Sequence, residues 1–88
     1  MRASSIDYSR KFLKRLKKLP ALVIDKFEER EVIFKYDIFD ARIETHKLHG
    51  KEHDYWSFSK NNKYRVKFMF LTDKTILFLD IGTHDEVY

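Results

Sequence analysis

The sequence predicts a single α+β domain, in which a short N-terminal strand and a two-helix hairpin precede a three-stranded antiparallel meander. Two patterns carry this prediction. Apolar residues recur at helical spacing between residues 10 and 35, whereas they alternate with polar residues between residues 64 and 81. The 88 residues can support one hydrophobic core. We therefore expect one domain over residues 1–88, with the helices on one face of the sheet.

Composition narrows the class of protein. Apolar residues make up 43% of the chain and aromatic residues 16%, which favours a compact core over a disordered chain. Cysteine is absent, so disulfides and thiolate chemistry are excluded, as is common in a reducing compartment. No apolar run has the length of a membrane span or a signal-peptide core. We expect a cytoplasmic protein with no membrane partner.

The N-terminal half predicts one strand and two helices. Residues 3–8 alternate weakly, and Ser9 is a suitable N-cap for a helix over residues 10–19. Pro20 ends that helix and suits the first position of a second helix, which runs to about Lys35. The residues expected to face the core are Phe12, Leu13, Leu16 and Leu19 in the first helix and Val23, Ile24, Phe27 and Phe34 in the second.

Residues 36–54 show no clean period and predict a long polar loop. Three of the four histidines lie there, at His46, His49 and His53. Loops of this length in compact domains are usually functional or mobile. We therefore expect this segment to contribute to a site.

Residues 55–88 predict three short strands. Asn61 and Asn62 suit a two-residue turn and residues 72–74 close the second hairpin. The expected faces are Tyr64, Val66, Phe68 and Phe70 against Arg65, Lys67, Met69 and Leu71 in the middle strand, and Ile76 and Phe78 against Leu77, Leu79 and Ile81 in the last. Beyond Gly82 lies a tail, either frayed or part of a site, with His84, Asp85, Glu86 and Tyr88.

Charge suggests an anionic partner. The formal net charge is +4, and six of the nine residues from 10 to 18 are basic. Such a run binds nucleic acid or an acidic protein segment, or else it is only a solvated helix face.

Arginine and histidine are the candidate chemical groups. An arginine in the middle of a strand, such as Arg65, is unusual unless it faces solvent or a ligand, and its fork of donors suits phosphate. Because helices cover only one face of the sheet, the face with Arg65 and Lys67 stays accessible. In the alternative interpretation, Arg65 pairs with Asp80 or Glu86 across the strands, and His84 is merely an exposed tail residue.

Other kinds of site are less well supported. The histidines of the 36–54 loop, followed by Asp54, could ligate zinc, but structural zinc sites draw on cysteine pairs that are absent here. We therefore expect no metal and no cofactor. Two glycines cannot build a phosphate-binding loop. Trp56 and Phe58 are interpreted as core residues and not as platforms for stacked bases.

Four segments carry a further signal: YSRKFLKRLKKLP, HKLHGKEHDYWSFS, KYRVKFMF and LFLDIGTHDEVY. Together, in this order and over nearly the whole chain, they resemble the RelE/ParE superfamily of toxins from bacterial type II toxin–antitoxin systems, and within it the RelE, YoeB and YafQ branch. The resemblance implies a small α+β fold, cleavage of mRNA in the ribosomal A site without a metal, and a cognate antitoxin that wraps around and blocks the toxin.

The resemblance also implies roles for single residues. Arg65 matches a phosphate-binding arginine, His84 a C-terminal histidine of proton transfer, and Tyr88 a terminal aromatic that supports the substrate. His46 falls where YafQ-like members have histidine and YoeB-like members glutamate, whereas RelE itself relies on lysines. The expected contacts to RNA and ribosome are Lys14, Arg15, Lys17, Lys18, Lys47, His49, Lys51, Lys63 and Lys67.

Metal-independent RNA cleavage needs a base for the ribose 2′-OH, an acid for the 5′-oxygen and a cation for the phosphorane. We favour His46 as base, His84 as acid and Arg65 as cation, although the sequence leaves the order of the histidines open. Two alternatives remain: a ParE-like DNA gyrase inhibitor that cleaves nothing, and an inactive toxin that only binds antitoxin. The presence of both histidines and Arg65 favours the nuclease.

Overall fold

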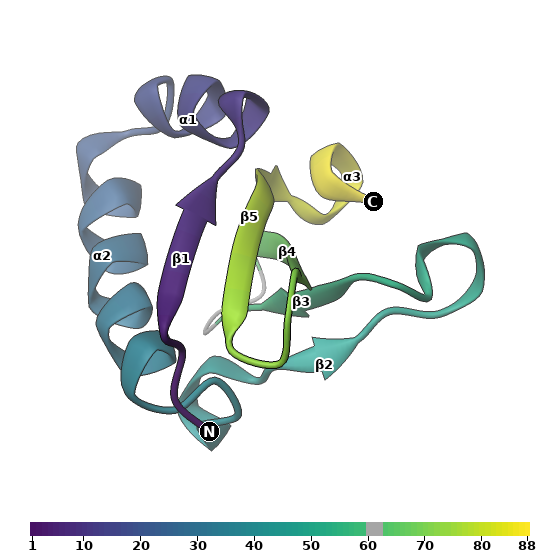
Figure 1. Cartoon of the computed structure of the whole chain (residues 1–88). Helices are drawn as coiled ribbons and strands as arrows, with labels where there is room; N and C mark the ends of the chain where they lie inside the picture. Colours follow the sequence, from purple (N-terminus) through teal and green to yellow (C-terminus); the bar gives the residue numbers. More distant parts are fainter. Residues whose placement is uncertain (60–62) are drawn as a thin grey trace.

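The computed structural model describes residues 1–59 and 63–88 and confirms the α+β fold (Figure 1). Its five-stranded sheet has the order β1-β5-β4-β3-β2. The strands are β1 (Ser5–Tyr8), β2 (His46–Lys47), β3 (Trp56–Phe58), β4 (Tyr64–Phe70) and β5 (Thr75–Thr83). The helices are α1 (Arg10–Lys17), α2 (Ala21–Tyr36) and α3 (His84–Val87), with 3₁₀ turns η1 (Ala41–Ile43) and η2 (Gly50–Glu52). The predicted turn at Asn61 and Asn62 lies outside the described residues.

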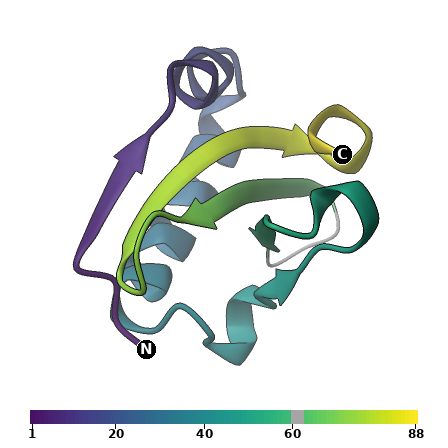
Figure 2. The same ribbon diagram turned by 45° about the vertical axis from the view of Figure 1, so that its right-hand side comes forward.

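The sheet is mixed. β1 pairs in parallel with β5, and the other neighbouring strands pair antiparallel. α1 and α2 form the connection that leaves β1, and Figure 2 shows α2 behind β4 and β5. The second face of the sheet is therefore free of α2 along these strands.

The start of α1 is fixed to the sheet by Ser9. The Ser9 hydroxyl accepts from the Phe12 amide at 3.0 Å and donates to the Leu79 carbonyl at 2.8 Å, which confirms the predicted N-cap. The Ser9 amide also donates to the Phe78 carbonyl at 2.9 Å. α1 ends two residues earlier than predicted, and α2 begins directly after Pro20.

Phenylalanine rings form most of the core. Phe34 stacks on Phe58 with centroids 4.7 Å apart and meets Phe68 edge-to-face at 5.0 Å. Phe58 is 1% exposed, and Trp56 packs against the same cluster, so both belong to the core as predicted. The other fully buried phenylalanine rings among the described residues are Phe12, Phe34, Phe68 and Phe78.

A β-bulge interrupts the alternation of β5. Lys67 is opposite Asp80 while Phe68 is opposite Phe78, so Leu79 is an extra residue without a partner on β4. The bulge places Ile81 in the core together with Phe78. The prediction that Ile81 shares the face of Leu79 was wrong, because it assumed strict alternation through the strand.

The segment from 36 to 54 is more ordered than a polar loop. It supplies η1, β2 and η2, and it buries Ile38, Ile43 and Leu48. The prediction of an irregular loop was wrong because three isolated apolar residues have no period to detect. The C-terminal tail is likewise ordered as α3, with Val87 buried.

Among the described residues, none of the helices is both long and apolar enough to cross a membrane.

Candidate functional site

Polar residues form a row across the face of the sheet that α2 does not cover. His46 on β2 is opposite Ser57 on β3, Ser57 is opposite Lys67 on β4, and Lys67 is opposite Asp80 on β5. Directly opposite residues share a face. Arg65 lies two positions before Lys67, so it shares this face and stands opposite Gly82. The structure thus brings three of the predicted cationic or titratable side chains to one surface.

His46 has a defined tautomer when neutral. Its Nδ1 lies 2.9 Å from the Glu44 carbonyl oxygen, which can only accept, so Nδ1 carries the proton. Nε2 is left with the lone pair. Glu44 adopts a left-handed conformation with φ of 50°, which turns the chain from η1 into β2. His46 is exposed and has the free nitrogen that a general base requires.

Lys67 is held by a residue that the sequence did not single out. Its Nζ lies 2.9 Å from Glu52 Oε2 and 4.6 Å from the centre of the Tyr55 ring, and its side chain is 15% exposed. The Glu52 carboxylate therefore neutralises this cation in the absence of a ligand. Glu52 reaches Lys67 because the chain folds back over the sheet at η2. This is a tertiary contact, so no local sequence pattern could have identified the pair.

Two polar atoms at this surface are buried and have no hydrogen-bond partner among the described residues. They are Ser57 Oγ, in a residue that is 0% exposed, and Arg65 Nε. Buried polar atoms are rarely left unpaired in folded proteins, because each costs free energy. Arg65 does not pair with Asp80 or Glu86, since Asp80 contacts α1 and Glu86 accepts from the Thr83 amide.

His84 and Tyr88 lie together on α3. Their rings meet edge-to-face with centroids 4.6 Å apart, and His84 Nδ1 faces the Asp85 carboxylate at 3.6 Å. A capping box orders this single turn, because the Glu86 carboxylate accepts from the Thr83 amide. This hydrogen bond from the Thr83 backbone lowers the pKa of Glu86 below its ordinary value of 4.5.

The two histidines lie at opposite margins of the surface. β2 and β5 are separated by three strand spacings, which is roughly 14 Å between the backbones. Arg65 on β4 lies between them. His46 contacts Glu44 while His84 contacts Asp85 and Tyr88, so each would approach a substrate from its own side.

The cations expected to bind RNA fall into two groups. Arg15 and Lys67 are engaged in ion pairs with Asp80 and Glu52, and Lys63 lies over the Tyr64 ring at 5.7 Å. Lys63 is also exposed, as are the others: Lys14, Lys17, Lys18, Lys47, His49 and Lys51.

The remaining histidines are not brought to a common centre. His53 Nδ1 lies 3.2 Å from the Gly50 carbonyl, and its Nε2 lies 3.3 Å from the Asp54 carboxylate. Within residues 1–59 and 63–88, no three histidine, aspartate or glutamate side chains are grouped as they would be to hold a metal ion.

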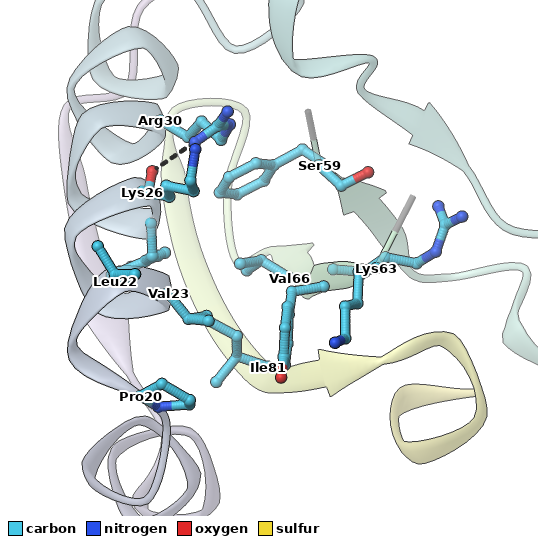
Figure 3. A pocket seen from close by; sticks show the side chains of 13 residues that line it. Pro20, Leu22, Val23, Lys26, Arg30, Ser59, Lys63, Val66 and Ile81 are labelled. Carbon is cyan, nitrogen blue, oxygen red and sulfur yellow. Dashed lines mark hydrogen bonds between the residues drawn. The ribbon is translucent and has the colours of Figure 1, made fainter. Parts of the chain in front are cut away.

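An apolar groove lies on the other side of the sheet, between α2 and strands β3 to β5 (Figure 3). Its volume is about 330 Å³, and Leu22 at its rim is 74% exposed. Lys26, Arg30 and Lys63 line it, and within the described part of the chain no acidic residue does. Arg30 is buried, and its Nη1 donates to the Lys26 carbonyl at 2.9 Å.

Comparison with known proteins gives matches among solved structures. No protein-family model and no curated protein matches the chain. YafQ in the DinJ–YafQ toxin–antitoxin complex of E. coli is 21% identical, with a TM-score of 0.77 over 100% of this chain and 99% of that one. The archaeal RelE–RelB complex of Pyrococcus horikoshii OT3 matches with 23% identity and a TM-score of 0.72, over 94% of this chain and 96% of that one.

The chain has the RelE-like fold. A YoeB/ParE toxin from Agrobacterium tumefaciens also shares it, with 14% identity and a TM-score of 0.74 over 96% of this chain and 99% of that one. All three relatives are toxins or complexes of toxin with antitoxin. At these identities the likeness concerns the fold, so the RelE-like fold confirms the predicted architecture and leaves the activity to be argued from the side chains.

Proposed function

We propose that this protein is the toxin of a type II toxin–antitoxin pair and that it cleaves mRNA on the ribosome. The observation that carries the proposal is the polar row on the open face of the sheet, with His46 at one margin, Arg65 at its centre and α3 with His84 at the other. The toxins that share the fold support the same class.

The chemistry assigned to this surface is in-line attack by a ribose 2′-OH on the adjacent 3′-phosphate. His46, with the lone pair on Nε2, would take the 2′-OH proton. His84 would give a proton to the leaving 5′-oxygen, with Tyr88 as the aromatic support beside it. Arg65 would stabilise the charge on the phosphorane, a role for which the fixed fork of a guanidinium is suited.

The exposed lysines would supply the affinity for the ribosome. Lys14, Lys17 and Lys18 lie along α1, while Lys47, His49 and Lys51 project from the segment that carries β2 and η2. Contacts of cations with RNA phosphates give affinity that is independent of sequence and falls as salt rises.

The antitoxin is the proposed protein partner. Two of the matched toxins are seen in complex with an antitoxin. The groove of this chain supports such a partner, because an apolar floor rimmed by Lys26, Arg30 and Lys63 suits an acidic amphipathic segment. We expect Lys26→Glu to weaken the complex with the antitoxin, and the loss to shrink at high salt, when the two are titrated by calorimetry.

The experiment that tests the activity is primer extension on a translated mRNA with the induced protein. Cuts within codons, in frame and only when the message is translated, are the expected result. His84→Ala should abolish them. His53→Ala is the matched control, because His53 is an exposed histidine on the same chain and is outside the proposed site.

Three outcomes would contradict the proposal. Growth arrest without cuts would point to a target other than mRNA, with DNA gyrase the first to test. Cuts that persist in His84→Ala would show that the assigned site is wrong. The absence of both arrest and cuts would leave a protein that only binds antitoxin.

A further inference from the structure

We propose that Arg15 is a positioning residue that holds α3, and with it His84, on the end of β5. This goes beyond the proposed function, and it differs from the family resemblance, which implied that Arg15 contacts RNA. Only the activity part of its test rests on that function.

The first step is the buried carboxylate of Asp80. Its side chain is 4% exposed and lies on β5, four residues before His84. Lys11 Nζ approaches one oxygen at 3.3 Å, and Arg15 Nε approaches the other at 3.4 Å. A buried carboxylate needs such partners, so Asp80 fixes the side chains of both α1 cations.

The second step is the contact of Arg15 with α3. Its Nη1 donates to the Glu86 carbonyl at 3.3 Å, so one guanidinium joins the strand to the C-terminal turn. Gly82 leaves the space for this arrangement. A Cβ on Gly82 would lie 3.2 Å from Arg15 Nη1 and 2.9 Å from Glu86 Oε1. Any side chain there would push against both groups.

The third step is that α3 has few other anchors. It is a single turn, and His84 contacts Asp85 and Tyr88 of the same segment. The position of His84 relative to the sheet therefore depends on the capping box, on buried Val87 and on Arg15. A guanidinium can hold two acceptors at once in a fixed geometry, which the compact ammonium of lysine cannot do.

The test compares Arg15→Ala, Arg15→Lys and Arg10→Ala. Arg10 is the matched control, because it is exposed on the same helix and its loss changes the charge equally. The first readout is amide hydrogen exchange at Thr83 and Tyr88, which donate to Glu86 and His84. We expect exchange to quicken by about 5- to 10-fold in Arg15→Ala, to quicken less in Arg15→Lys, and to stay unchanged in Arg10→Ala.

The second readout separates positioning from binding. In a purified translation system, Arg15→Ala should lower the cleavage rate at saturating ribosome and leave the half-saturating ribosome concentration nearly unchanged. Arg15→Lys should restore the rate only in part. A cation that merely contacts RNA would behave in the opposite way, with weaker ribosome binding and full rescue by lysine.

Asp80→Asn gives an independent variant, since it removes the charge that holds Arg15 without a large change in volume. It should quicken exchange at Tyr88 as Arg15→Ala does. Unchanged exchange in both variants would overturn the proposal. A wild-type protein that cuts no mRNA would overturn the proposed function instead, and exchange would still decide the role of Arg15.

Discussion

The two faces of the sheet meet different physical demands. The face under α2 is filled by phenylalanine rings, and Phe34, Phe68 and Phe78 are fully buried there. The opposite face carries the row from His46 to Asp80, and it leaves Ser57 Oγ and Arg65 Nε buried without partners among the described residues. The side chains of the first face are closely packed. The second face retains two polar atoms for which the described residues provide no hydrogen-bond partner.

The two faces of the sheet contribute differently to the stability and to the function of the protein. Apolar burial supplies the free energy of folding, and each ring contributes through its buried area and its contacts. Unpaired polar atoms lower that free energy, so Ser57 Oγ and Arg65 Nε on the open face point to a ligand that supplies the missing partners, and Arg30 Nε beside the groove is a third such atom. Substitutions on the two faces should therefore have opposite effects.

The largest effect is expected on the packed face. Phe78→Ala should lower the free energy of unfolding by ~3–5 kcal/mol, because the ring is fully buried and contacts the rings of Phe12, Phe34 and Phe58. Chemical denaturation measures the change. Leu71→Ala is the control, since Leu71 is 48% exposed and should cost less than ~0.5 kcal/mol. If Phe78→Ala lowered the free energy of unfolding by less than ~1.5 kcal/mol, the packed face would not have the role in stability assigned to it here.

On the open face, Arg65→Ala should impair activity and leave the fold intact. Loss of one preorganised charge-stabilising group lowers a rate by ~10²–10³-fold. The unfolding free energy should change by less than ~1 kcal/mol, because no hydrophobic cavity opens. Cleavage in a translation system and denaturation of the same preparation test both parts. Arg42→Ala, an exposed arginine paired with Asp40, should leave cleavage unchanged.

A stabilising substitution would sharpen the contrast. Ser57→Ala removes a hydroxyl that is buried without a partner, so the free energy of unfolding should rise by ~1 kcal/mol. For a domain of this size the melting temperature would rise by roughly 4–8 °C. Ser5→Ala, at an exposed position on β1, is the control. A fall in melting temperature for Ser57→Ala would show that the hydroxyl is satisfied.

The smallest effect is expected at α3, as a dependence on pH. The pKa of Glu86 in the folded chain lies below its ordinary 4.5, chiefly because of the Thr83 amide. Its carboxylate therefore stabilises α3 fully above pH 4.5, and this contribution is lost as the pH falls through the lower folded value. The Thr83 amide shift in NMR should follow this titration. Glu86→Gln keeps an acceptor and should abolish it.

Local sequence patterns predicted the regular elements well. Ser9, Pro20 and the apolar stripe of α2 identified both long helices, because capping and periodicity act within a few residues. The alternation in β4 also identified its two faces, with Val66 and Phe68 inward and Arg65 outward. The family resemblance agrees with the RelE-like fold.

Other features could not be predicted because they arise from tertiary contact. Asp80 was considered as a partner for Arg65, yet α1 brings Lys11 and Arg15 to it. Nothing in the loop sequence indicates that Glu52 pairs with Lys67. An aspartate within the apolar run ILFLDIG was the available signal of a buried ion pair, although it could not identify the partners.

Because of the bulge at Leu79, the number of residues in β5 determines which face of the sheet each later side chain occupies. Point substitutions would preserve it, since an unpaired extra position tolerates many side chains. If Leu79 were instead paired with Lys67 in strict alternation, every later residue of the strand would change sides. Asp80 would then turn toward the phenylalanine core, and Ile81 would turn to the open side. The unpaired Leu79 thus determines which face of the sheet each later residue of β5 occupies, and with it the side of the molecule on which His84 lies.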